Sequence, residues 1–180
     1  MRLVGLLQMW AWARAVYEKP DEDAVVRTVT WMQVVVNTVY YGLEGPVYLA
    51  GKGVLKGWSE EKKARWWRVA SMCFGGHVGL EIVRLARTWQ LRQEKTRALE
   101  KEGEGEKEAG DGVRLTKEER VRALREDERK WMTSAQINAA FAPLCVHWSI
   151  PGGFVSDTWY GLLGSWAASL YIRDAWRNSA

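Results

Sequence analysis

A long uncharged stretch near the C-terminus limits most strongly what this chain can fold into. Residues 132–156 contain no Asp, Glu, Lys or Arg, and after Asp157 a second uncharged run covers residues 158–172. A Pro-Gly-Gly sequence at residues 151–153 lies between the two runs. Because Pro and Gly are strong turn signals, the pattern predicts a helical hairpin over residues 131–180. Its natural surroundings would be lipid or a protein partner rather than water.

The charged residues are concentrated just before this hairpin, in residues 92–130. The segment holds 12 basic and 12 acidic residues, so the net charge of +4 arises from the rest of the chain. Its first part, up to Gly112, has too few apolar residues to offset the entropy of folding, and we expect it to be disordered. Thr116 and Glu119 form a capping box, which predicts a charged helix leading into Trp131.

Two helices are predicted in the first 50 residues. Residues 1–17 are mostly apolar and predict a helix that ends near Pro20. The Val and Thr of residues 24–49 favour a strand by propensity, but their polar side chains recur with the 3.6-residue period of a helix. The polar stripe consists of Thr30, Gln33, Asn37, Tyr40 and Glu44. We therefore predict a second helix, which Gly45-Pro46 would kink or end.

A basic segment rich in Trp follows and leads into a third helix, which begins near Ser59 and runs to about Gln93. Each Lys or Arg near anionic headgroups contributes about 1 kcal/mol to membrane binding, and Trp favours the membrane boundary. The predicted membrane-surface residues are Lys52, Lys56, Trp58, Lys62, Lys63, Arg65, Trp66, Trp67 and Arg68. A solvated loop is the competing explanation. Nucleic acid is a weaker one, because no nucleic-acid-binding module is recognisable.

Tryptophan is unusually common, with 12 Trp against 3 Phe. A soluble core would normally use Phe and Leu, because a buried Trp must also satisfy its N–H group. Trp131 and Trp176 flank the two uncharged runs, which is typical of a bilayer interface.

Small residues predict close helix packing in two places. Gly residues four apart on one helix, or stripes of Gly, Ala and Ser, let helix backbones approach closely in lipid. The predicted packing residues are Gly75 and Gly79 in the third helix, and Gly161, Gly164, Ser165, Ala168 and Ser169 in the last helix.

The sequence does not support catalysis. Cys73 and His77 are four apart on a helix, and Cys145 with His147 could complete a Cys2His2 zinc site. However, Cys145 and His147 would point about 200° apart on a helix. Buried thiols and ordinary histidines are the better explanation. We expect no enzyme activity, no metal and no cofactor.

The order of several motifs resembles the peroxisomal biogenesis factor 11 (peroxin-11) family over residues 24–176. The most telling landmarks are His147-Trp148, Ser156-Asp157 and the Gly-Leu-Leu-Gly sequence at residues 161–164. The earlier motifs are NTVYYGLEGPVYLA at residues 37–50, GWS at 57–59, RWW at 65–67, the charged insert and PLCVHW at 143–148.

The resemblance implies a peroxisomal membrane protein that promotes peroxisome elongation, division and proliferation. Its implied partners are peroxisomal membrane lipids, further copies of itself and dynamin-related division machinery. Family members usually have a longer region before Tyr40-Tyr41, often with a membrane-remodelling amphipathic helix, so we expect a short or N-terminally truncated, fungal-type member. The alternative function is that of a soluble helical protein-interaction module.

These inferences combine into an all-α, membrane-associated helical bundle with a C-terminal hairpin and a charged disordered insert. We divide the chain into N-terminal helices with amphipathic membrane-binding segments (1–91), the charged insert (92–130) and the C-terminal membrane hairpin (131–180).

Overall fold

In the part of the chain that the structure describes, most residues lie in helices. The computed structural model describes residues 5–105 and 111–179, and every regular element in those ranges is a helix. The helices are α1 (Gly5–Glu18), α2 (Ala24–Gly51), α3 (Glu60–Gly105), α4 (Asp111–Ser149) and α5 (Asp157–Ser179). The predicted all-α class is confirmed.

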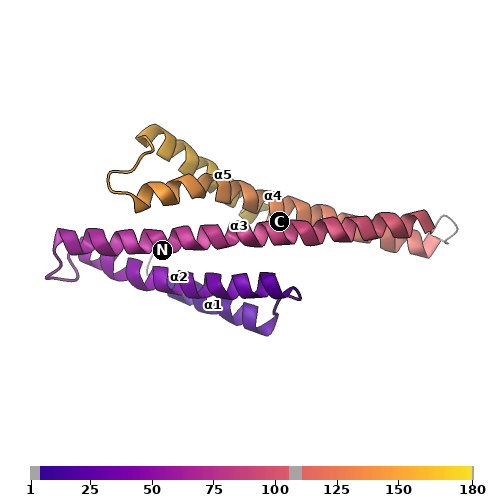
Figure 1. Ribbon diagram of the computed structural model, residues 1–180, viewed down its shortest axis with the longest axis horizontal. Coiled ribbons are helices and arrows are strands. Elements are labelled where there is room, and N and C mark those ends of the chain that lie inside the picture. The colour runs from indigo at the N-terminus through magenta and orange to yellow at the C-terminus, as the bar shows by residue number, and fades with distance from the viewer. Residues whose placement is uncertain (1–4, 106–110, 180) are drawn as a thin grey trace.

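Each helix packs mainly on the helices next to it in sequence. Within the described residues, the packed pairs are α1 with α2, α2 with α3, α3 with α4, and α4 with α5. The long helix α3 therefore runs through the middle, with α1 and α2 on one side and α4 and α5 on the other (Figure 1). This open, serial arrangement leaves much of the surface of each helix uncovered.

The helix starts follow from local capping. Asp23 caps α2, since its carboxylate accepts the backbone N–H groups of Val25 and Val26 at 3.1 and 3.0 Å. Ser59 precedes α3, and its hydroxyl accepts the N–H of Lys62 at 3.2 Å. Such side chains satisfy N–H groups that have no partner within the first helical turn.

Pro46 does not end α2, although that was one of the two predicted outcomes. The helix continues to Gly51, and Val47 and Ala50 beyond the proline are both buried. Proline removes one backbone hydrogen bond from a helix interior, so tertiary packing of this last stretch holds the helical conformation.

Residues 92–112 are predicted to be disordered. This prediction is wrong for residues 92–98, which continue α3. The reason is pairing with α4: the guanidinium of Arg92 donates to the backbone oxygen of Asp127 at 3.1 Å and lies over the Trp131 ring. The helix bounds place residues 99–105 in α3 and residues 111–112 in α4, while residues 106–110 lie outside the described part. We call the paired segments, α3 from Arg92 onward and α4 up to Lys130, the stalk.

Candidate functional site

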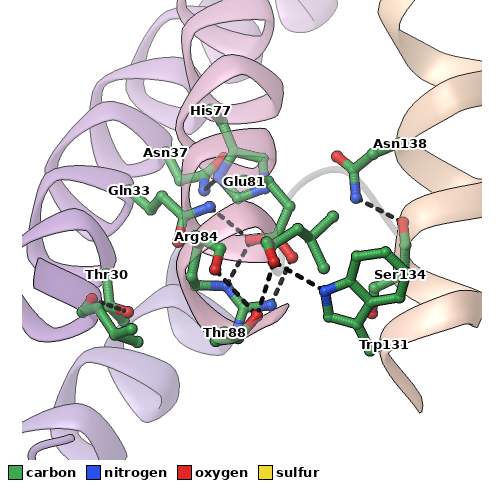
Figure 2. A network of polar contacts seen from close by, with 12 residues as sticks. Thr30, Gln33, Asn37, His77, Glu81, Arg84, Thr88, Trp131, Ser134 and Asn138 are labelled. Atoms are coloured by element: carbon green, nitrogen blue, oxygen red, sulfur yellow. Dashed lines mark hydrogen bonds and ion pairs between the residues drawn. The ribbon is translucent and has the colours of Figure 1, made fainter. Parts of the chain in front are cut away.

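The interior between α2 and α3 is polar (Figure 2). Gln33 of α2 donates to the Glu81 carboxylate of α3 at 2.8 Å, and Arg84 donates to the same carboxylate at 2.7 Å. One helical turn away, the amide nitrogen of Asn37 lies 2.7 Å from Nδ1 of His77. The predicted polar stripe of the second helix therefore faces the interior of the molecule.

Three of these polar groups, Gln33, Asn37 and Glu81, are buried, and Arg84 and His77 are partly buried. Gln33 is 1% exposed and Glu81 is 8% exposed, and Gln33 and Leu144 are the largest fully buried side chains. Burying a polar group is costly unless it finds a partner, and here each group has one.

The outer surface is apolar, in contrast to the polar interior between α2 and α3. Large apolar side chains on the uncovered helix faces are solvent-exposed in the isolated chain: Trp31, Val35 and Val39 on α2, Met72 and Val83 on α3, and Leu162, Trp166 and Ile172 on α5. Soluble monomers rarely expose contiguous apolar surface on this scale. In membranes, by contrast, polar residues face the bundle interior and apolar residues face lipid.

Among the described helices, α3 contains a candidate membrane span. Within the described residues, one helical segment, Glu60–Ala98, is long and apolar enough to cross a membrane, and only 28% of its apolar window is buried. The described helices of the C-terminal hairpin are not long and apolar enough by the same measure, so the anchoring role of residues 131–180 stays a prediction.

The predicted membrane-surface residues gather at one end of the molecule, in the α2–α3 loop and the first turns of α3 (Figure 1, left). The ammonium of Lys62 lies 4.4 Å from the Trp58 ring centre, and Trp58 packs edge-on against Trp66 at 5.1 Å. Lys63 pairs with Glu60. Lys52, Lys56, Arg65, Trp67 and Arg68 are exposed beside them. We call these nine residues the loop-end patch.

The landmarks His147 and Trp148 organise the turn between α4 and α5. The Nδ1 atom of His147 accepts the backbone N–H groups of Phe154 and Val155, both at 3.0 Å. Gly153 has a φ of 61°, and a Cβ there would overlap the His147 ring. Trp148 packs edge-on against Tyr160. Sequence reasoning missed this role, although the spacing of His147 to the Pro-Gly-Gly turn was a visible signal.

The remaining landmarks, Ser156 and Asp157, begin α5. The backbone oxygen of Ser156 accepts the N–H of Tyr160 at 2.9 Å, and Asp157 supplies an acid to the first turn. An acid in this position complements the helix dipole.

The predicted small-residue packing is present within the chain only in part. A Cβ on Gly75 would lie 3.5 Å from the Cys145 side chain, so Gly75 permits close contact between α3 and α4. Open space surrounds the corresponding positions of Gly79, Gly161 and Gly164, and Ser165, Ala168 and Ser169 are exposed. On α5, Ala167 and Leu170 are the buried residues. A packing role for the open positions between copies of the chain stays a prediction.

Three of the four residues considered for zinc have separate surroundings, and the fourth, Cys73, is partly buried on α3. His77 contacts Asn37, His147 contacts the α4–α5 turn, and Cys145 is buried near Gly75. Among the described residues there is no group of three or more His, Cys, Asp or Glu that could hold a metal ion.

An ion pair joins the start of α2 to α3. The Arg87 guanidinium lies 2.8 Å from the Asp23 carboxylate. This hydrogen bond, followed by that from the N–H of Val26, lowers the pKa of Asp23 from 3.8 to about 2. Asp23 thus caps α2 and fixes its position against α3.

Comparison with known proteins identifies the family. The family model described as Peroxisomal biogenesis factor 11 (PEX11) matches residues 1–176. No curated protein and no solved structure matched the chain. The PEX11 family is one of biogenesis factors rather than enzymes, and it agrees with the polar interior and apolar exterior described above. The chain therefore belongs to the peroxisomal biogenesis factor 11 family and is a peroxisomal membrane protein involved in peroxisome proliferation.

Proposed function

We propose that this protein promotes the elongation and division of peroxisomes by inserting into their membrane and changing its shape. The observation that carries this proposal is the inverted polarity of α2 and α3, with Gln33 and Glu81 buried and Val35 and Met72 exposed. Lipid tails would cover the apolar outer faces without disturbing the internal hydrogen bonds.

The loop-end patch supports a defined depth in the membrane. Its cations and Trp rings lie together beyond the apolar part of α2 and α3, where headgroups would meet them.

The serial arrangement of the helices also matters, since an open array displaces more lipid per residue than a closed bundle of the same helices. Displacing lipid unequally in the two leaflets would favour membrane curvature.

Self-association and recruitment of dynamin-related division machinery complete the proposal. The uncovered positions Gly161, Gly164 and Ala168 on α5 support close approach of a second copy, because small residues permit tight helix contacts in lipid. The contact with division machinery rests on the family alone.

The test is a rescue experiment in cells that lack this protein. We expect the wild-type chain to co-localise with a peroxisome marker, to resist carbonate extraction and to restore the number of peroxisomes. Lys52→Gln/Lys56→Gln should reduce the rescue, while the matched control Arg122→Gln/Arg125→Gln, which removes two exposed charges from the stalk, should not. A chain that is monodisperse without detergent and released by carbonate would instead be a soluble interaction module.

A further inference from the structure

Two cavities meet where α3 packs against α4. One has a volume of about 420 Å³, lies between α3, α4 and α5, and extends from Lys130 to the rings of Phe74 and Phe141. The other has a volume of about 350 Å³ and lies between the α1–α2 connection, α3 and α4, at the base of the stalk. Lys130 and Ser134 line both cavities, so the cavities adjoin at these two side chains. We call the two cavities together the α3–α4 cleft.

The polar side chains of α4 in this cleft make no hydrogen bond to another helix within the described residues. Thr133 donates to the backbone oxygen of Arg129 at 3.0 Å, and Asn138 donates to that of Ser134 at 2.8 Å, so both bonds stay inside α4. The polar side chains of α2, by contrast, bond directly to side chains of α3. Figure 2 shows Ser134 and Asn138 on α4, with the bonded pairs of α2 and α3 on the other side of the view.

The position of these α4 side chains decides what can surround them. Thr133, Ser134 and Asn138 are half-buried and lie in the uncharged run of the C-terminal hairpin. Lipid tails offer no hydrogen bonds, and a polar group without a partner is costly in an apolar medium. Polar side chains of membrane helices therefore face the bundle interior or a water-filled cavity.

The charged side chains of the cleft indicate a neutral occupant. The lining contains the cations Arg84, Arg92, Lys95 and Lys130 and the acids Asp21, Glu81, Asp127 and Asp174. Arg84 is bonded directly to Glu81. Because the two signs balance, the lining favours neutral hydrogen-bonding molecules over an anion or a cation.

The cleft is open at the stalk and closed toward the loop end. Its stalk side is lined by the exposed Lys95. At the other end the ring of Phe74 lies 5.5 Å from that of Tyr40, 5.7 Å from that of Phe141 and 6.3 Å from that of Trp148, measured between ring centres. These packed aromatic rings separate the cleft from the loop end.

We propose that water fills the α3–α4 cleft when the protein is in the membrane, and that small neutral solutes enter it from the stalk side as far as Phe74. Water bonds to Thr133, Ser134 and Asn138, and the volume of either cavity far exceeds the roughly 30 Å³ that one water occupies. The proposal rests on the membrane insertion proposed above. It makes the bundle wet on the stalk side of Phe74 and dry on the loop side.

The test measures thiol reactivity in the full chain, reconstituted into phosphatidylcholine vesicles and shown by flotation to be bound to them. Asn138→Cys and Ala139→Cys lie at the same depth, the first in the cleft and the second exposed on the outer face. Both are made in a Cys73→Ala/Cys145→Ala background and treated with a membrane-impermeant methanethiosulfonate reagent on both sides. We expect Asn138→Cys to react at least about tenfold faster, because the reacting thiolate forms in water and not in lipid.

Two further measurements sharpen the result. Ser134→Cys replaces a single atom of a cleft side chain, so it should fold like the wild type and react like Asn138→Cys. With reagent added outside only, the labelled fraction of Ser134→Cys should equal that of Arg122→Cys on the exposed stalk, and not that of Val54→Cys in the loop.

Equal or faster reaction of Ala139→Cys in vesicles would overturn the proposal, as would labelling of Ser134→Cys from the side of Val54→Cys. Failure of the wild-type chain to float with the vesicles would contradict the proposed membrane function itself. The two failures are therefore distinguishable.

Discussion

The two faces of α2 have the reverse of the polarity that is usual in a water-soluble protein: the buried face is polar and the exposed face is apolar. The face that contacts α3 carries Gln33 and Asn37, both buried, whereas the opposite face carries Val35 and Val39, both about half-exposed or more. In a water-soluble helix the polar stripe would mark the outside. In α2 the polar stripe lies inside the molecule. The comparison shows that which face of an amphipathic helix is buried depends on the solvent that surrounds the protein.

A similar contrast exists between two ion pairs in α3 that have the same spacing. Glu60 pairs with Lys63 at the loop end, where the glutamate side chain is 89% exposed, and Glu81 pairs with Arg84 in the interior, where the glutamate side chain is 11% exposed. Exposed pairs contribute about 0–1 kcal/mol, whereas breaking a buried pair leaves a charge without compensation. The comparison can be tested at both faces and both pairs.

The largest effect is expected for Glu81→Ala. The change leaves Arg84 and Gln33 without their shared acceptor, and we expect the free energy of unfolding to fall by about 3–5 kcal/mol. Denaturant unfolding in detergent measures this loss. Glu60→Ala is the control, with an expected loss of less than about 1 kcal/mol. Similar losses for the two variants would contradict the distinction between a polar interior and a solvated loop end.

The next largest effect is expected for Val35→Lys on the outer face. A lysine in the middle of a membrane helix costs about 2.5–3.5 kcal/mol of insertion free energy, so the fraction that resists carbonate extraction should fall. Val54→Lys, in the exposed α2–α3 loop, adds the same charge at the proposed headgroup depth and should have no such effect. Unchanged extraction of Val35→Lys would mean that this face does not contact lipid.

A third prediction concerns Gly153, which is tightly packed although it lies in an end turn. Gly153→Ala introduces strain at a positive φ and overlaps the His147 ring, and we expect it to cost about 1–3 kcal/mol. Gly152→Ala also has a positive φ but meets open space, so its thermal unfolding temperature should fall less. If the two variants had the same thermal unfolding temperature, the His147 contact would not restrain the turn.

The smallest effect is expected for Asp23→Asn and depends on pH. Since the folded-state pKa of about 2 lies below the ordinary value of 3.8, the carboxylate stabilises the fold above about pH 4. This contribution is lost as the pH falls from about 4 to about 2. Asn keeps the helix cap, so the melting difference between wild type and Asp23→Asn should shrink over this interval. A difference that persists at pH 2 would assign the effect to capping rather than to Arg87.

The helices of this protein could be predicted well, because they follow from local signals. The polar period of residues 30–44 outweighed the strand propensity of its Val and Thr residues, and the acids at 21–23 marked the start of α2. The sequence left open whether α2 would continue past Pro46, and the continuation of α3 past Gln93 was not predicted, because it involves a contact between Arg92 and the distant Asp127.

The residues of the functional site could be predicted from the sequence where they are neighbours in the chain, but the arrangement of distant residues in space could not. The loop-end patch is continuous in sequence, so its residues were found together. A cavity lined by Asp21, Arg92 and Lys130 brings together residues that are distant in sequence, and no local sequence pattern predicts that they lie close together. The role of His147 likewise depends on the path of the turn, which follows from the positive φ of Gly152 and Gly153.

The continuity of α3 has a mechanical consequence. At about 1.5 Å per residue, its 46 residues form a rod about 70 Å long that runs from the loop-end patch to the far end of the stalk. A rotation of the molecule by about 10° around the loop end would move the far end of that rod by about 12 Å. A change in membrane slope at the loop end would thus become a displacement of the far end of the stalk.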